Sequence, residues 1–191
     1  VMLVLTLHAF TRFLVWVEGR EGVTLDDPIL RLMEPKDFTW ATFAVIYLAL
    51  VAAIVHLLKR PYDLLLAMQS YMLMVGVRAA MMFLAPFNPA EGLIVLRDPL
   101  VQLAGDGTAP TKDLFFSGHT ATLFLLFLII QQRVLKVTYL LFTMLVAVFV
   151  VWQHVHYVID VAVAPFVAYA CYRVVVLMQD RTLAGKGRAT H

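Results

Sequence analysis

Long apolar runs alternate with short polar segments along the whole chain. Crossing the hydrocarbon core of a bilayer takes roughly 20 apolar residues in a helix, and six runs come near this length. They lie at about 1–17, 40–58, 62–84, 115–131, 137–153 and 157–178. The pattern predicts an all-α membrane protein: a bundle of six transmembrane helices that forms a single polytopic domain over residues 1–191. No small-residue cleavage site follows the first run, so we expect a helix there rather than a signal peptide.

The charges of the loops predict how the helices are oriented. Loops on the cytoplasmic side of a membrane carry an excess of Lys and Arg. The segments 59–63, 131–136 and 179–191 contain seven basic and two acidic residues, whereas 18–38 and 85–113 contain five basic and ten acidic residues. We therefore expect both termini in the cytoplasm and the two long loops on the outer side.

Composition narrows the class of protein further. Hydrophobic residues make up 62% of the 191 residues, against about half in soluble domains. The net charge of +2 argues against a nucleic-acid partner. The single cysteine, Cys171, cannot form an internal disulfide, and nothing in the sequence indicates an oligomeric state.

Polar residues that can do chemistry collect at the outer ends of three predicted helices. The stretch "DLFFSGHT" (113–120) opens the fourth helix, and "QHVHYVID" (153–160) joins the fifth helix to the sixth. Arg78 lies about six residues from the outer end of the third helix, roughly 9 Å at 1.5 Å per residue. Three distant parts of the sequence are therefore expected at one depth on one side of the membrane.

His156 and Asp160 form the first candidate pair. Their spacing of four residues puts them on one face of a helix, where the carboxylate can hold one imidazole nitrogen and leave the other free as a nucleophile or base. A structural histidine satisfied by a neighbouring aspartate is the alternative. Ionisable groups inside a membrane are costly and usually functional, which favours catalysis.

An anion site is expected at the start of the fourth helix. Backbone N–H groups at a helix N-terminus favour an anion, Gly118 would let an oxyanion approach the backbone, and Ser117 adds a hydroxyl donor. Asp113 is expected to cap this entry, and His119 lies beside it as an acid or base. Arg78 is expected to clamp a phosphate; its alternatives are snorkelling to the surface or pairing with a buried acid.

Other residues near these motifs are weaker candidates. His154 lies two residues from His156 and would point in another direction on a helix. Glu91, in the outer loop, and Tyr157 are additional site candidates. Two histidines and an aspartate can also hold zinc, but the sequence has neither an HExxH motif nor a dense ligand cluster. We therefore expect no metal in the site.

The motifs resemble those of the sphingomyelin synthase family, a branch of the type-2 phosphatidic acid phosphatase superfamily. "DLFFSGHT" is similar to the third motif of that family, "HYVIDVAVAPF" (156–166) to the fourth and "YMLMVGVRAAMMFLAP" (71–86) to the second. The phosphatase "K-x6-RP" signature is absent, which places the resemblance nearer the synthase branch. The similar region covers roughly residues 40–175, and the compact loops resemble those of a bacterial member.

The resemblance implies a reaction and a location. A family member of this kind would face the periplasm from a bacterial inner membrane. It would move a phosphate or phospho-headgroup from a phospholipid to a lipid alcohol, or to water as a lipid phosphate phosphatase. The resemblance implies that His156 forms a phosphohistidine, Asp160 orients it and His119 transfers protons, with no cofactor. The implied lipid partners include ceramide or diacylglycerol. The alternative from a different functional class is a proton-coupled transporter in which His and Asp side chains relay protons.

Overall fold

The structure, a computed structural model, describes residues 1–98 and 109–188, with side chains described up to residue 181. Within these ranges the chain is all-helical, as the apolar pattern predicts. The helices are α1 (Met2–Glu18), the short 3-10 helix η1 (Leu30–Leu32), α2 (Thr39–Leu57), α3 (Pro61–Leu84), α5 (Gly118–Ile129), α6 (Arg133–Trp152) and α7 (Val158–Arg188).

Each predicted apolar run contains one α-helix, but three helices differ in extent from the prediction. Helix α5 has only 12 residues, because Phe115 has a positive φ of 104° and Ser117 and Ile130 have extended ψ values of 110° and 120°. Helix α6 begins at Arg133 rather than at 137. Helix α7 continues to Arg188 rather than ending at 178, so part of the polar segment 179–191 is helical.

Several helices have the length and surface of membrane spans. Helices α2, α3, α6 and α7 are each long and apolar enough to cross a bilayer, whereas α1 and α5 have 17 and 12 residues. Large apolar side chains point outward along the bundle: Leu48 is 61% exposed, Leu141 59% and Phe166 76%. Extensive apolar surface of this kind is unusual on a soluble monomer. These features indicate an integral membrane protein.

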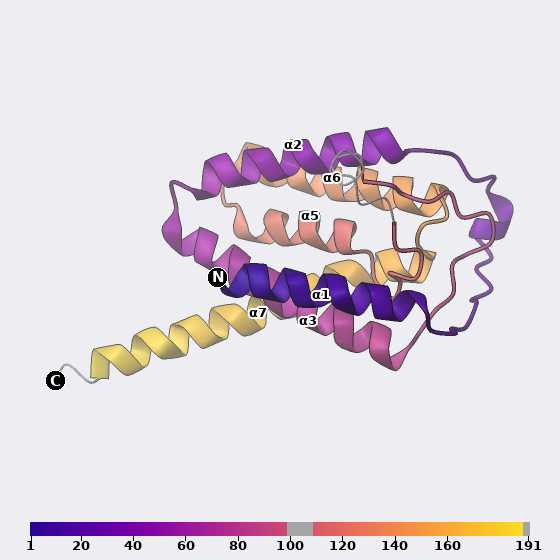
Figure 1. The fold of residues 1–191 in the computed structure, drawn as a ribbon. Coiled ribbons are helices and arrows are strands. Elements are labelled where there is room, and N and C mark those ends of the chain that lie inside the picture. The colour runs from indigo at the N-terminus through magenta and orange to yellow at the C-terminus, as the bar shows by residue number, and fades with distance from the viewer. Residues whose placement is uncertain (99–108, 189–191) are drawn as a thin grey trace.

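Successive helices run in alternating directions through the bundle (Figure 1). The start of α1 and the end of α7 lie at one end, and the segments 19–38, 85–98, 109–117 and 153–157 gather at the other. The last turns of α7 project away from the bundle (Figure 1). The chain thus brings its motif-bearing connections to one end, which we call the loop end.

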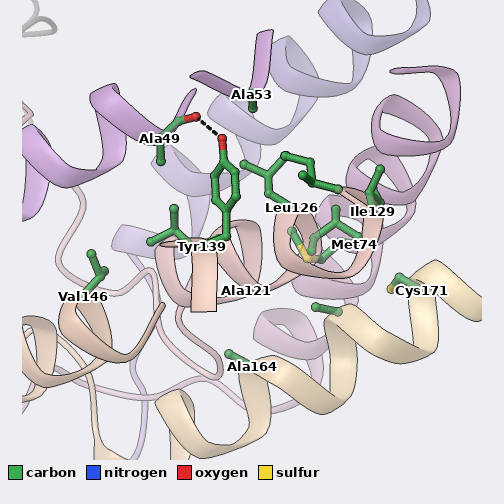
Figure 2. Close-up of a cluster of buried hydrophobic side chains, with 14 of the residues drawn as sticks. Ala49, Ala53, Met74, Ala121, Leu126, Ile129, Tyr139, Val146, Ala164 and Cys171 are labelled. Carbon is green, nitrogen blue, oxygen red and sulfur yellow. Dashed lines mark hydrogen bonds between the residues drawn. The ribbon is translucent and has the colours of Figure 1, made fainter. Parts of the chain in front are cut away.

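The short helix α5 lies among the longer helices and supplies much of the core. Its buried residues Ala121 and Leu126 pack in one cluster with Ala49 of α2, Tyr139 of α6 and Ala164 of α7 (Figure 2). The Tyr139 hydroxyl donates a hydrogen bond of 2.7 Å to the Ala49 carbonyl. Small residues let helices approach closely where no hydrophobic driving force acts between them in lipid. This packing fixes α5, and with it the "SGHT" motif, against α7.

The segments at the loop end are tied to one another by backbone contacts. Val23 and Phe87 form an isolated parallel bridge, in which Val23 N donates to Pro86 O over 3.0 Å and Asn88 N donates to Val23 O over 3.0 Å. A Cβ atom on Gly22 would lie only 2.7–2.9 Å from backbone atoms of 86–88, so this approach requires glycine. The first outer segment therefore lies directly against the segment that follows α3.

Candidate active site

Helix α5 begins at the predicted motif, and Ser117 is its N-cap. The Ser117 Oγ accepts hydrogen bonds from the backbone N of Thr120 at 3.3 Å and from its hydroxyl at 3.0 Å. Serine is favoured at this position because its side chain satisfies N–H groups that have no partner within the helix. Ser117 is fully buried. The helix N-terminus is thus fixed inside the protein rather than at its surface.

The expectation that Asp113 caps this helix is wrong. The chain is not helical between Asp113 and Ser117, so the Asp113 carboxylate lies four residues before the cap. Asp113 Oδ1 instead lies 2.8 Å from Nη2 of Arg78, and the same nitrogen donates to the Asp113 carbonyl over 3.4 Å. Asp113 therefore holds the arginine in place.

Arg78 reaches from α3 to the start of α5. Its side chain is 11% exposed, and its guanidinium carbon lies 5.6 Å from the ring centre of Phe116 and 6.0 Å from that of Phe10. Its Nε is buried and makes no hydrogen bond with any described residue. A buried donor without a partner is costly, and an anionic ligand would supply the missing acceptor.

Gly118 leaves room for the Arg78 guanidinium. A Cβ atom at position 118 would lie 1.4 Å from Nη1 and 2.6 Å from the guanidinium carbon of Arg78. The space that we expected an oxyanion to enter beside Gly118 is therefore filled by the arginine. The positive charge of Arg78 and the partial positive charge of the α5 N-terminus act at the same place.

His119 and Arg78 line one small cavity of about 140 Å³. The cavity is several times the roughly 30 Å³ that a water molecule occupies in the liquid. The Nδ1 atom of His119 is buried and makes no hydrogen bond with the described residues, while Phe43 meets the imidazole ring edge-on at 6.0 Å between centres. The cavity thus combines a fixed cation with an uncommitted imidazole.

His156 and Asp160 make the predicted contact, although not on a helix face. Helix α7 begins at Val158, so His156 lies in the turn before it and Asp160 lies in its first turn. His156 Nδ1 is 3.3 Å from Asp160 Oδ2, and the same oxygen accepts a 3.2 Å hydrogen bond from the Tyr157 backbone N. Both side chains are buried. Asp160 therefore holds the imidazole and the turn that carries it.

The two motifs meet through their backbones. Ser117 N donates a 3.2 Å hydrogen bond to the Asp160 carbonyl, which joins the starts of α5 and α7. Electrostatic interactions connect His119 with Arg78 and with His156. His156 and Asp160 are not among the residues that line the 140 Å³ cavity; they lie next to it, at the α5 N-cap that the Asp160 carbonyl contacts.

Two additional candidates lie elsewhere. Glu91 and Tyr157 line a separate cleft of about 720 Å³ at the loop end, together with His154. The imidazole Nδ1 of His154 is 2.8 Å from the Glu91 carbonyl oxygen. The Tyr157 hydroxyl accepts from Leu25 N at 3.3 Å and donates to Asn88 O at 3.0 Å. These contacts indicate that His154 and Tyr157 hold loops together.

The structure adds residues to the site that the motifs did not indicate. Phe10, Tyr71 and Thr122 line the small cavity beside Arg78 and His119. A larger and mostly apolar cavity of about 560 Å³ adjoins it between α2, α3 and α5, and Tyr71, His119 and Thr122 line both. Only their positions after folding identify these residues, because neither an aromatic nor a threonine in an apolar helix is unusual.

A carboxylate and a tyrosine also line the larger cavity. Asp98 and Tyr47 form a hydrogen bond there. Asp98 interacts electrostatically with His119, so it is a second carboxylate near this imidazole, in addition to Asp113. Among the described residues, no group of three His, Cys, Asp or Glu side chains is arranged to hold a metal ion.

Comparison with known proteins gives one match. Residues 112–177 match the family described as PAP2 superfamily C-terminal. The matched segment contains His119, His156 and Asp160 but not Arg78. The match supports the type-2 phosphatidic acid phosphatase superfamily and, at that level, an enzyme of the lipid phosphatase or phosphotransferase type. No curated protein and no solved structure matches the chain significantly.

Proposed function

We propose that this protein is a membrane-embedded phosphotransferase or phosphohydrolase that acts on lipid phosphates through a phosphohistidine. The observation that carries the proposal is the junction of two motifs at one buried place. The His156–Asp160 pair is hydrogen-bonded through its backbone to the N-cap of the helix whose first residues carry Gly118 and His119. Arg78 supplies the positive charge at that junction.

Phosphate binding follows from the donors at the start of α5. Arg78 presents a guanidinium with an unpaired Nε, and guanidinium groups suit phosphate oxygens in both charge and geometry. The helix N-terminus adds its partial positive charge. In the pentacoordinate transition state the equatorial oxygens carry negative charge, which these preorganised groups stabilise. Because Asp113 already pairs with Arg78, a bound phosphate competes with that carboxylate.

The proposed chemistry has two displacements at phosphorus. In the first, Nε2 of His156 forms a bond to phosphorus while the bond from phosphorus to the lipid oxygen breaks, and His119 gives that oxygen a proton. In the second, His119 takes a proton from the acceptor hydroxyl, whose oxygen bonds to phosphorus as the bond to His156 breaks. Asp160 keeps Nδ1 of His156 as the protonated nitrogen and stabilises the imidazolium.

A lipid substrate is supported by the adjoining apolar cavity. The cavity of about 560 Å³ lies between α2, α3 and α5 and is lined mostly by apolar side chains such as Ile46, Leu50 and Leu126. It shares His119 with the small polar cavity. A phosphate bound at Arg78 would therefore have an apolar space beside it, as a molecule with a polar head and an acyl chain requires.

The acceptor decides which enzyme this is. Transfer to a lipid alcohol such as ceramide would be the reaction of a sphingomyelin-synthase-like enzyme, whereas transfer to water would be that of a lipid phosphatase. Purified protein incubated with a panel of phospholipids and lipid phosphates, with and without ceramide, should form phosphorus-containing products that mass spectrometry resolves. A new phospholipid in the ceramide samples indicates the transferase, and inorganic phosphate or a free phospho-headgroup indicates the hydrolase. The absence of any turnover across the panel argues against the proposal.

We also propose the orientation that the loop charges predict. The six α-helices of the described residues then cross or enter the membrane, both termini lie in the cytoplasm, and the loop end faces the periplasm of a bacterial inner membrane. The alternation of helix directions in Figure 1 is compatible with this arrangement. The substrate would reach the site from the outer leaflet.

A further inference from the structure

The turn that carries His156 precedes a helix whose own N-cap residue cannot cap it. Tyr157 occupies the position before the first residue of α7, Val158. Caps are normally Ser, Thr, Asp or Asn, whose short side chains accept hydrogen bonds from the first N–H groups of the helix. The long Tyr157 side chain instead extends to Leu25 and Asn88. Helix α7 therefore needs an acceptor from elsewhere in the chain.

Asp27, from the first outer segment, supplies that acceptor. Its Oδ2 accepts a 2.9 Å hydrogen bond from the backbone N of Val158. Its other oxygen, Oδ1, accepts from the backbone N of Ile29 at 3.0 Å and of Leu30 at 3.3 Å. Leu30 is buried against Tyr157 in a small apolar cluster at the loop end. One carboxylate thus holds the start of α7 and is itself held by the turn that leads into η1.

We infer that Asp27 is a positioning residue for the nucleophile, and this inference rests on the proposed function. The turn 156–160 is held from two sides: Asp160 Oδ2 binds His156 Nδ1 and Tyr157 N from within, and Asp27 binds Val158 N from outside. A carboxylate at a helix N-terminus is also favoured by the helix dipole. Without Asp27, the first turn of α7 loses its external acceptor, and Asp160 no longer holds the imidazole in one orientation.

The adjacent residue provides a matched control. Asp26 carries the same charge one position earlier, but its side chain is 73% exposed. Within the described part of the chain it pairs with Arg31, whose side chain is 66% exposed, over 3.1 Å. Replacing either aspartate by alanine removes one negative charge from the same loop. Only Asp27→Ala removes a hydrogen bond to α7.

The test is a rapid-quench measurement of phosphoenzyme formation in full-length Asp27→Ala, Asp27→Asn and Asp26→Ala. A loss of positioning lowers the rate constant of the burst, because displacement of a reacting group by about 1 Å can cost on the order of 10²-fold. A merely structural role lowers the burst amplitude, which counts folded sites, and leaves the rate constant unchanged. We expect Asp27→Ala to lower the rate constant by roughly 10- to 100-fold, Asp27→Asn to lower it less, and Asp26→Ala to match the wild type.

Hydrogen–deuterium exchange separates failure of this inference from failure of the proposed function. Peptides that cover 156–163 should exchange faster in Asp27→Ala than in Asp26→Ala, whereas peptides within α6 should not differ. If the wild type forms no phosphoenzyme, the proposed function fails while the exchange still tests the hydrogen bond. Equal exchange in both variants, or an unchanged burst rate constant in Asp27→Ala, would overturn the assignment of Asp27.

Discussion

Replacing Gly118 by alanine should disable the site by moving Arg78 without unfolding the protein. The new Cβ would lie 1.4 Å from Nη1, against 3.4 Å for ordinary contact, so the guanidinium must move by about 2 Å. The free end of a flexible side chain can make this shift, whereas backbone could not. Because a misplacement of about 1 Å can cost roughly 10²-fold, we expect kcat/KM to fall by at least about that factor, equivalent to about 2.7 kcal/mol of transition-state stabilisation.

Phosphate release from a lipid phosphate in detergent micelles measures the effect, and a second glycine provides the control. Gly76 lies in α3, the helix that carries Arg78, and a Cβ there would meet no atom within 4 Å. Gly76→Ala should therefore keep wild-type activity, and its better helix propensity should stabilise the helix by up to about 1 kcal/mol. The thermal midpoint of Gly118→Ala should stay close to that of the wild type.

The coupling between the two residues tests the reasoning more strictly. If Gly118→Ala acts by displacing Arg78, then Gly118→Ala combined with Arg78→Ala should be no worse than Arg78→Ala alone, because the two changes remove the same interaction. Losses that multiply in the double variant, or a Gly118→Ala variant within about threefold of the wild type, would refute the idea that this glycine serves the arginine.

Burial raises the pKa of the Tyr157 hydroxyl above 10.0, although the hydrogen bond from Leu25 N opposes this shift. Above about pH 10 the unfolded chain loses the Tyr157 proton first, while the folded protein still holds it. The contribution of this hydroxyl to the free energy of unfolding is therefore complete below about pH 10 and falls as the pH rises above that value. As the pH rises above about 10, the thermal midpoint of Tyr157→Phe should decline less steeply than that of the wild type. Equal slopes in the two proteins would contradict a raised pKa of the Tyr157 hydroxyl. A chelator should leave activity intact and vanadate should inhibit, whereas loss in EDTA that zinc restores would favour a metal site. In a Cys171→Ser background, Glu21→Cys should react with an impermeant thiol reagent in intact cells and Gln132→Cys should not; reversed labelling would contradict the proposed orientation.

Much of the helical architecture could be predicted because it depends on local sequence. Apolar runs indicate helices wherever they occur, and the spacing of His156 and Asp160 predicted a contact that the structure forms at 3.3 Å. The start of the fourth helix was harder to place. A positive φ at Phe115 and the extended cap Ser117 shorten α5, and hydropathy cannot detect a backbone bend within an apolar run.

The remaining features depend on contacts between distant parts of the chain. Asp27 lies 131 residues before the N–H group that it binds, so no local pattern distinguishes it from its neighbour Asp26. Asp113 has the residue type of a helix cap, yet the fold places it beside Arg78. The apolar run predicts that the last helix ends near 178, because hydropathy separates apolar from polar sequence and does not separate helix from coil; the helix continues to Arg188.

In the proposed mechanism His156 carries the phosphoryl group and His119 moves protons. Rapid quench with a radiolabelled phosphate donor, followed by mapping of base-stable and acid-labile label, measures this directly. Wild-type protein should carry label on His156, and His156→Ala should carry none. His119→Ala should still become labelled on His156, more slowly by the roughly 10²–10⁴-fold that a general acid contributes, with a smaller loss for a nitrophenyl phosphate ester whose leaving group needs no proton. Label on His119, or a phosphoenzyme that persists in His156→Ala, would contradict these roles.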